Sequence, residues 1–347
     1  MTDTDFQAEQ PATRSAITIV DIARLAGVNP STVSRALAGS RAVTEETRRR
    51  IGEIARANGY VANHSARRLR SRKAGQVLVM LPNIAAFSHP QIISGIEDAL
   101  EEHGIGVIVG STKGNAERET ALAEQLVAGA ADGVIILTGK IPESLSASPH
   151  YRHRIIAISR PVDIPDVAFV GIDDRRAAHD ATRHLLSLGK SEIVHLSGPS
   201  DSPIFTARAR GYADAMTEAG LADRIEVIHL PAFTIDAGRA AMQQLRSRQA
   251  RLSAILCASD ELAFGAIQVA KELGMRVPED VAFVGFDDHP VSGAFTPTLT
   301  TIKIPRHLLG YTGAKALVQH LENGRVSLMT EYLPHTLCVR ESCGSKQ

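Results

Sequence analysis

The stretch GVNPSTVSRAL, Gly27–Leu37, combines small residues, three hydroxyl side chains and a single arginine. Asn29 is a preferred N-cap residue, and Pro30 suits the first helical position because its missing N–H would have no partner there. Val33 and Leu37 lie four residues apart and therefore share one helix face, while the hydroxyls and the arginine fall mostly on other faces. The stretch predicts a short helix with one buried and one polar face.

A second helix is predicted immediately before this stretch. Thr18 is a suitable N-cap residue, and Asp21 three residues later completes a start that resembles a capping box. Ile22, Leu25 and Ala26 then recur at helical spacing, as the buried face of an amphipathic helix does. A glycine follows and ends the helix.

A third helix is predicted to begin at Thr44, with Glu45 and Glu46 in its first turn, where the helix dipole favours acids. Its buried stripe is predicted to be Ile51, Ile54 and Ala55. Two short helices joined by a tight turn, with a third packed across them, describe a helix-turn-helix domain. In that motif the second helix enters the major groove of DNA. The alternative is a small helical bundle with no nucleic-acid role.

Charge separates this N-terminal region from the rest of the chain. The net charge is zero, with 38 basic and 38 acidic residues. Residues 17–73 carry 12 bases and 4 acids (+8), residues 1–16 carry 1 base and 3 acids (−2), and residues 74–347 carry 25 bases and 31 acids (−6). This asymmetry predicts a polyanionic partner for the basic module, although a solvated basic face is the alternative.

The remaining totals exclude several classes of protein. A chain of 347 residues is long enough for two or three domains. Residues 1–16 are polar and acidic and lack signal-peptide features, so we expect a flexible tail on a cytoplasmic protein without a membrane partner. Cys257, Cys338 and Cys343 lack the spacing of a zinc site and are predicted to be reduced thiols. We therefore expect no metal and no cofactor.

The helical region closely resembles the headpiece of the LacI/GalR family of bacterial transcription regulators. The blocks VDIARLAGV, STVSRAL, EETRRRI and ANGY follow one another in the family's order, and the similarity continues to near the C-terminus. The resemblance implies a DNA-binding headpiece at residues 17–62, a hinge at 63–73 and an effector-binding and dimerisation core at 74–347.

The resemblance also implies DNA-binding roles by position. Pro30, Ser31 and Arg35 occupy the base-reading positions, and Thr32 and Ser34 match phosphate contacts. Because a proline side chain offers only apolar contact, polar readout is expected from the serine and the arginine. Further DNA-binding positions are Thr18, Thr44 and Thr47 in the headpiece and Asn63, Ala66 and Leu69 in the hinge.

The hinge segment NHSARRLRS matches a helix that folds on the operator in this family. Its leucine is expected to wedge into the minor groove, which costs base unstacking but yields a bent and better-wrapped duplex. The alternative is a solvated tether.

Beyond residue 74 the pattern alternates short apolar strands with amphipathic helices, and the rhythm repeats after FVGIDD. Such alternation predicts two doubly wound α/β subdomains with parallel sheets, and the resemblance makes them subdomains of the periplasmic-binding-protein type. The N-subdomain is expected at about 74–172 and 304–332, and the C-subdomain at about 173–303 and 333–347.

Ligands of such sheets bind beyond the carboxyl ends of the strands. By position, the family's effector pocket corresponds to Ser88, His89, Arg160, Arg208, Phe233, Ser259 and Asp287. An arginine and an aspartate beside an aromatic platform suit a sugar, and the added positive charge of Arg160 and His89 also suits a sugar acid or a sugar phosphate.

Several residues that follow the predicted strands have structural alternatives. Asp173 and Asp287 are potential helix caps, Arg208 is a potential surface residue, and His89 before Pro90 is a potential loop-shaping residue. The loop AFSH, which contains His89, differs from the family's usual NPFF.

We expect a dimeric repressor, with a tetramer as the alternative assembly, that binds double-stranded operator DNA and a small-molecule effector. A periplasmic sugar-binding transport protein would need a signal peptide. A sugar-processing enzyme would need catalytic residues, and the sequence predicts none: GIGVIVG lacks dinucleotide-site spacing, and no GxSxG or Walker motif occurs.

Overall fold

The computed structural model describes residues 17–37, 40, 42–60, 73–248, 251–324 and 330–345. The chain divides into two compact units, with the boundary between Arg72 and Lys73, and each unit is described by itself. The predicted tail and the hinge positions Asn63, Ala66 and Leu69 lie outside the described residues.

The first unit contains three helices, α1 (Ile19–Ala26), α2 (Pro30–Leu37) and α3 (Glu45–Ala57). The capping box of α1 is confirmed, because the Thr18 hydroxyl accepts from the Asp21 N–H and the Asp21 carboxylate accepts from the Thr18 N–H. The start of α2 at a proline and the threonine cap of α3 are also as predicted.

The core of this unit is small, and one residue predicted to belong to it is exposed. Ile22, Val33 and Ile51 are fully buried, and all three helices contribute to one apolar cluster. Leu25, predicted to be buried, is 56% exposed. At 100° per residue it lies about 60° from Ile22 on the side away from Ala26, so it points past the neighbouring helices.

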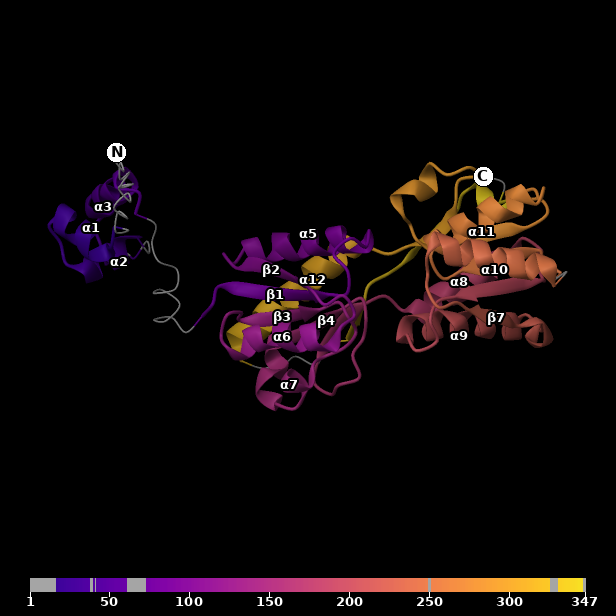
Figure 1. The fold of residues 1–347 in the computed structure, drawn as a ribbon, viewed down its shortest axis with the longest axis horizontal. Helices are drawn as coiled ribbons and strands as arrows, with labels where there is room; N and C mark the ends of the chain where they lie inside the picture. Colours follow the sequence, from indigo (N-terminus) through magenta and orange to yellow (C-terminus); the bar gives the residue numbers. More distant parts are fainter. Residues whose placement is uncertain are drawn as a thin grey trace, which may run out of the picture. The chain divides into compact units, whose positions relative to one another are not determined.

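The second unit has two lobes, which we call the N-lobe and the C-lobe (Figure 1). The N-lobe sheet is parallel throughout in the order β11-β5-β4-β3-β1-β2. Its strands are β1 (Gln76–Leu81), β2 (Gly106–Ser111), β3 (Gly133–Ile136), β4 (Ile155–Ile158), β5 (Ala168–Gly171) and β11 (Thr330–Tyr332). Its helices are α5 (Ser88–Glu101), α6 (Ala116–Val127), α7 (Glu143–Ser146), the 3-10 turn η1 (Pro149–Arg154) and α12 (Arg306–Asn323).

Both faces of the N-lobe sheet are covered, which explains its continuous apolar strands. In β1, Val77 and Val79 belong to the cluster that includes α5 and α12. The alternate residues Leu78 and Met80 belong to the cluster that includes α6 and α7.

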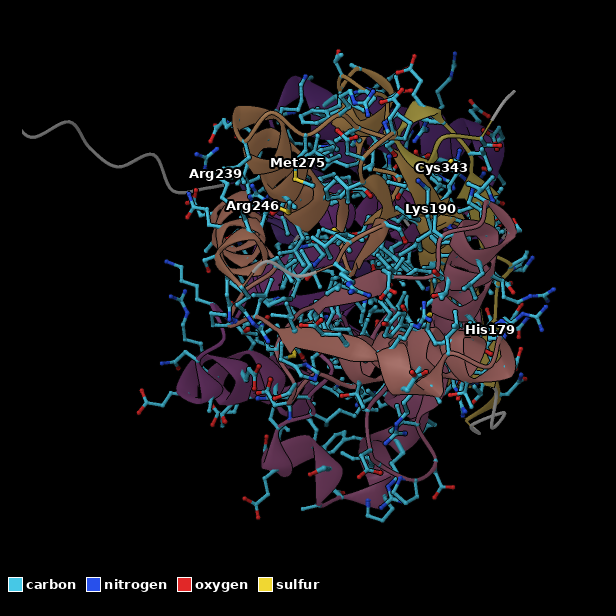
Figure 2. All side chains as sticks on the ribbon, turned by 90° about the vertical axis from the view of Figure 1, so that its right-hand side faces the viewer. His179, Lys190, Arg239, Arg246, Met275 and Cys343 are labelled. Carbon is cyan, nitrogen blue, oxygen red and sulfur yellow. The ribbon has the colours of Figure 1, made fainter. Side chains whose placement is uncertain are left out.

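The C-lobe sheet has the order β12-β10-β9-β8-β6-β7. Its strands are β6 (Ile193–Ser197), β7 (Glu226–His229), β8 (Ala254–Cys257), β9 (Ala282–Asp287), β10 (Thr300–Lys303) and β12 (Thr336–Cys338). Its helices are α8 (Asp174–Ser187), α9 (Pro203–Glu218), α10 (Ile235–Ser247) and α11 (Asp260–Glu272), with the 3-10 turns η2 (Ala222–Arg224), η3 (Pro290–Gly293) and η4 (Glu341–Cys343). Helices α8 and α9 pair with each other, as do α10 and α11. Figure 2 shows His179 of α8 and Arg239 of α10 on opposite sides of this lobe.

The prediction of wholly parallel sheets is wrong at one edge of the C-lobe, because β12 runs antiparallel to β10. The chain leaves β10 toward the N-lobe and returns through residues 333–335 directly into β12. The returning strand therefore enters at the sheet edge where β10 ends and must run in the opposite direction.

Close helix packing in the C-lobe depends on glycines, and Gly211 is an example. A Cβ atom at Gly211 of α9 would lie 1.9 Å from the carbonyl oxygen of Arg175 in α8, so only glycine allows this approach. The contact brings the start of α8 beside the middle of α9. Across the described residues, no helix combines the length and apolar character that a membrane span requires.

Candidate functional site

The polar face of α2 is presented to solvent, while its other face anchors the helix. Val33 and Ala36 are buried in the headpiece core. Ser31 and Arg35 are exposed, and Thr32 and Ser34 are half-buried. The Arg35 Nε donates to the carbonyl oxygen of Ser31 at 3.2 Å, which leaves the rest of its guanidinium for a ligand. Pro30 begins the helix and is exposed.

Three of the threonines predicted to contact DNA, Thr18, Thr44 and Thr47, lie at helix N-termini, where unpaired N–H groups favour anions. Thr18 caps α1, and its hydroxyl donates to the Asp21 carboxylate at 2.6 Å. Thr44 caps α3 and donates to the Thr47 hydroxyl at 2.9 Å. All three have structural roles that do not exclude a phosphate contact.

Part of the basic charge of this unit stabilises its fold. The Arg50 guanidinium donates to the carbonyl oxygen of Ala26 at the C-terminus of α1 at 2.9 Å. Arg48 donates to the Val43 carbonyl at 3.2 Å and pairs with Glu45 at 3.0 Å. Sequence reasoning counted these arginines only as charge, because their carbonyl partners are set by how the helices pack.

In the second unit, residues beyond the carboxyl ends of the strands meet between the lobes. Phe87, which follows β1 in the N-lobe, and His289, which follows β9 in the C-lobe, have ring centroids 4.2 Å apart. We call the residues gathered around this contact the interlobe site.

Arg208 is buried in the interlobe site and is fully engaged. Its Nε and Nη2 each lie 2.8 Å from the Asp174 carboxylate, and Nη1 donates to the Ala258 carbonyl. Its guanidinium carbon is 3.6 Å from the centroid of the Phe286 ring, a cation–π contact. Burial raises the pKa of Asp174, and the arginine opposes that shift. Arg208 lies within α9 and is 5% exposed, so the surface-residue interpretation is wrong.

Asp287 is also paired, with a residue that sequence reasoning missed. Arg306, the first residue of α12, lies 3.1 Å from the Asp287 carboxylate through Nη2, and its Nη1 donates to the Asp287 carbonyl. Its guanidinium carbon is 4.7 Å from the centroid of the Phe87 ring, and the side chain is 4% exposed. Because Arg306 belongs to the N-lobe and Asp287 to the C-lobe, this ion pair bridges the lobes.

Arg160 is the cation of this site that lacks a dedicated partner. Among the described residues its guanidinium makes no hydrogen bond or ion pair. Burial and the nearby Arg208 lower its pKa, while Asp174 and Asp287 act in the opposite direction. The preceding residue, Ser159, has a φ of 67°, an uncommon conformation for a residue with a side chain.

The remaining predicted pocket residues divide between structural and exposed positions. Ser259 caps α11 and donates to the Phe233 carbonyl at 3.3 Å. His89 is buried, and its Nδ1 lies 2.6 Å from the Asn83 carbonyl oxygen, which supports the loop-shaping interpretation. Burial lowers the pKa of His89. Ser88 begins α5, and Phe233 is 41% exposed with its ring 5.4 Å from that of Phe205.

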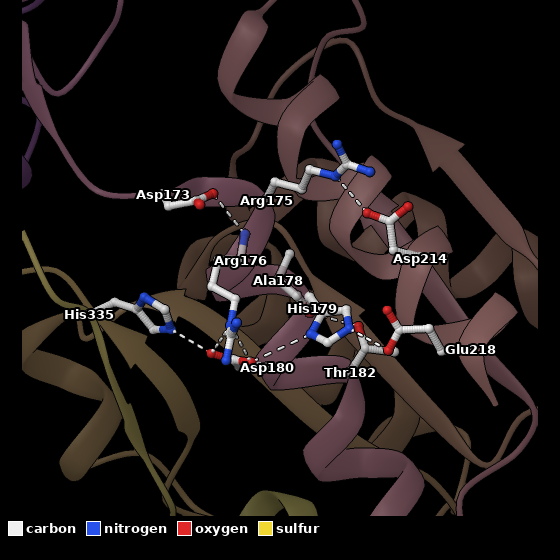
Figure 3. Close-up of polar contacts among 10 residues, drawn as sticks. All are labelled: Asp173, Arg175, Arg176, Ala178, His179, Asp180, Thr182, Asp214, Glu218 and His335. Carbon is white, nitrogen blue, oxygen red and sulfur yellow. Dashed lines mark hydrogen bonds and ion pairs between the residues drawn. The ribbon is translucent and has the colours of Figure 1, made fainter. Parts of the chain in front are cut away.

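A second charged cluster lies between α8 and α9 of the C-lobe (Figure 3). It lines a shallow cavity of about 510 Å³, and its charges pair with one another: Arg175–Asp214 at 2.6 Å and His179–Glu218 at 2.9 Å. Asp173 caps α8 by accepting from the Arg176 N–H, which confirms its cap interpretation. Internally paired surface charges of this kind contribute little binding capacity.

Family models cover most of the chain. Residues 18–63 match the model described as bacterial regulatory proteins, lacI family. Residues 74–337 match the model described as periplasmic binding proteins and sugar binding domain of LacI family.

Individual relatives extend over nearly the whole length. Catabolite control protein A of Priestia megaterium is 31% identical over 331 residues, which cover 94% of this chain and 99% of that protein. The lac repressor dimer bound to operator and the anti-inducer ONPF superimposes with a TM-score of 0.85 at 25% identity, over 95% of this chain and 99% of that one. The transcriptional regulator CelR in complex with cellobiose gives 0.68 at 28% identity, over 94% and 99%.

Proposed function

The chain belongs to the LacI family of bacterial regulatory proteins, and we propose from this membership that it is a repressor that binds a near-palindromic operator as a dimer under the control of a small-molecule effector. DNA binding is supported by the exposed polar face of α2, which belongs to a three-helix unit with a basic composition. Selection of bound duplexes from a random pool tests it, and a two-fold symmetric motif is the expected result.

The side chains of the headpiece divide by chemistry. Ser31 and Arg35, both exposed, are the proposed base readers, and Pro30 offers apolar contact to a thymine methyl group. Thr32 and Ser34 are proposed to contact phosphates. Phosphate contacts are also proposed for Thr18, Thr44 and Thr47, and a minor-groove role for the hinge positions Asn63, Ala66 and Leu69.

We propose that the effector binds in the interlobe site and carries an anionic group. Arg208 and Arg306 are each neutralised by an aspartate, whereas Arg160 has no carboxylate of its own. A half-buried cation without a counter-ion favours an anion, because less water competes for it than at the open surface. Among the ligand classes that suit the family's sugar-binding core, this favours a sugar acid or a sugar phosphate over a neutral sugar.

A thermal-shift screen of neutral sugars, sugar acids, sugar phosphates and nucleosides tests this assignment. A specific ligand at 100 times its dissociation constant stabilises the protein by about 2.7 kcal/mol. Arg160→Gln is expected to weaken binding of the anionic ligand about tenfold to hundredfold, the value of a charge-assisted hydrogen bond. Arg183→Gln, an exposed arginine on α8, is the matched control and should bind normally. A neutral sugar that binds the wild type and Arg160→Gln equally well would contradict the assignment.

We propose that a groove in the C-lobe is part of the dimer interface. The groove has a volume of about 460 Å³ and lies along α10, α11 and η3. Its apolar lining includes Ile235 and Val291, each 44% exposed, and Phe264 and Phe295, whose rings are 4.8 Å apart. The occupant is a second copy of this chain, as supported by the relative that is a dimer on its operator.

Val291→Glu is expected to raise the dimer dissociation constant at least about tenfold, because two copies would bury a carboxylate in an apolar contact. Sedimentation velocity over a concentration series measures this constant. Leu273→Glu is the matched control, since Leu273 is also 44% exposed but lies at the end of α11 outside the groove. Equal weakening by both substitutions would place the interface elsewhere.

A further inference from the structure

A buried carboxylate lies directly behind the interlobe site. Asp260, the first residue of α11, is fully buried. Its carboxylate accepts hydrogen bonds from the hydroxyl of Thr301 at 2.6 Å, the hydroxyl of Ser292 at 2.6 Å and the N–H of His289 at 2.7 Å. These donors come from β10, from η3 and from the loop after β9, so a single side chain fastens three segments to α11.

The segment held in this way connects the two proposed sites. At one end, Asp287 bridges to Arg306 in the interlobe site. At the other end, Val291 and Phe295 line the groove. Between them, the His289 ring contacts Phe87 on the interlobe side, and it also lies 5.7 Å from the ring of Phe264 in the groove.

The backbone of this segment needs such support. Asp287 has a φ of 116° and Asp288 a φ of 50°, conformations that cost free energy in residues with side chains and persist only where the surroundings enforce them. The Asp288 N–H donates to the Thr301 hydroxyl, which itself donates to Asp260. Asp260 therefore also supports the strained turn that aims the Asp287 carboxylate.

We propose that Asp260 is a positioning residue that holds the Asp287 carboxylate of the interlobe site and the groove residues 289–295 as one unit, so that the two move together. The inference rests on the proposed function, because it assigns a means by which effector occupancy changes the dimer interface. Such a change requires an effector that binds the two arrangements with different affinity.

The charge state of Asp260 offers a direct probe of this unit. Burial raises its pKa to about 7, with a further increase from Asp287, while the hydrogen bonds from Ser292, Thr301 and His289 act in the opposite direction. The held state of the segment therefore favours the protonated carboxyl. As pH rises from 6 to 8 the carboxyl ionises, and an opened segment in which the carboxylate is hydrated gains stability relative to the held one.

Other titratable groups also surround Asp260. Burial lowers the pKa of His289, so its titration falls below the ordinary range of histidine. Burial raises the pKa of the Cys257 and Cys338 thiols, and it raises the pKa of Glu261 on the same helix. Among the described residues, further charges nearby are Asp287, paired with Arg306, and Asp288, paired with Arg340 and Lys303.

Hydrogen–deuterium exchange of residues 286–299 in the full-length protein tests the proposal. After correction for the intrinsic rate, wild-type exchange is expected to rise about tenfold between pH 6 and pH 8, as a held-state pKa of about 7 requires. Asp260→Asn carries a permanently neutral group of the same shape and should abolish this rise. Asp280→Asn is the control: Asp280 is exposed and its hydrogen bonds with Arg276 hold its pKa at about 2, so the rise should persist.

A second variant tests whether hydrogen bonding to the Asp260 carboxylate sets the midpoint of the pH response. Thr301→Val removes one hydrogen bond to the carboxylate and should move the midpoint of the rise to higher pH. A pH response retained in Asp260→Asn, or absent from the wild type, would overturn the proposal. A rise in exchange confined to residues 287–288, or confined to residues 291–295, would also overturn the proposal, because a single unit must open at both ends.

Sedimentation velocity tests whether the charge state of Asp260 also changes the dimer dissociation constant. The wild-type dimer dissociation constant should rise at least threefold between pH 6 and pH 8, and that of Asp260→Asn should stay constant. A stable dimer whose dissociation constant ignores both pH and Asp260→Asn would overturn the coupling. Absence of a dimer at every pH would instead contradict the proposed function, while the exchange measurement would still decide the role of Asp260.

Discussion

Arg208→Met is expected to lower the free energy of unfolding by about 3–5 kcal/mol, the cost of breaking a buried ion pair by removing one partner. The Asp174 side chain is 10% exposed, so its carboxylate would remain buried without a counter-ion. The cation–π contact with Phe286 would be lost as well. Urea denaturation followed by circular dichroism measures the loss.

Two further variants identify the cause of this loss. Arg208→Met combined with Asp174→Leu removes both charges and should recover most of the stability, because the uncompensated charge dominates the cost. Arg175→Met breaks the exposed pair with Asp214 and should leave the urea midpoint unchanged. A double variant as unstable as Arg208→Met would contradict a dominant cost of the unpaired charge. In the single variant, acidification should restore stability as Asp174, whose pKa is raised by burial, becomes protonated.

Arg35→Ala is expected to relax base preference at one position of each operator half-site at a cost of about 1–3 kcal/mol. The arginine is exposed near the end of α2 and has donors left for a guanine edge. Gel-shift titrations against operators with single base changes measure this effect. Arg35→Lys should retain charge but lose bidentate pairing, and therefore most of the base preference.

Arg56→Ala, an exposed arginine in the last turn of α3, serves as the matched control. It should leave the pattern of base preference intact. If Arg35→Ala weakens binding to all sequences equally and lowers the salt slope, Arg35 is a phosphate contact and the reading assignment fails.

Local signals in the sequence predicted local structure well. The capping box of α1, the proline start of α2 and the threonine cap of α3 are confirmed, since each depends on residues at most four apart. Leu25 marks the limit of this reasoning. Helical spacing identifies a stripe, but the position of the neighbouring helices decides which side of the stripe is buried.

The pairings in the interlobe site depend on contacts that are distant along the chain. Arg208 and Asp174 are 34 residues apart, and Arg306 meets Asp287 across the two lobes. No periodicity encodes such pairs, because helix packing and chain crossover bring them together. The family resemblance predicted Asp287 and Ser259 as pocket positions, yet it did not show that the aspartate pairs with Arg306 or that the serine is a helix cap.

The pairing also shapes the expected response to an effector. Arg306 and Asp287 join the lobes, so a ligand that competes for either group changes how the lobes are held. An anion that binds Arg160 leaves the Arg306–Asp287 ion pair intact and is expected to stabilise the arrangement in which the lobes are joined. A ligand that displaces this ion pair is expected to favour separation of the lobes.

Operator recognition is tested most directly by selecting duplexes from a random pool with the full-length wild type and with Arg35→Ala and then sequencing them. The wild type is expected to enrich a two-fold symmetric motif, and the variant is expected to enrich the same motif with one degenerate position in each half-site. Recovery of sequences without a symmetric motif, by a protein that is folded and dimeric, would contradict operator recognition.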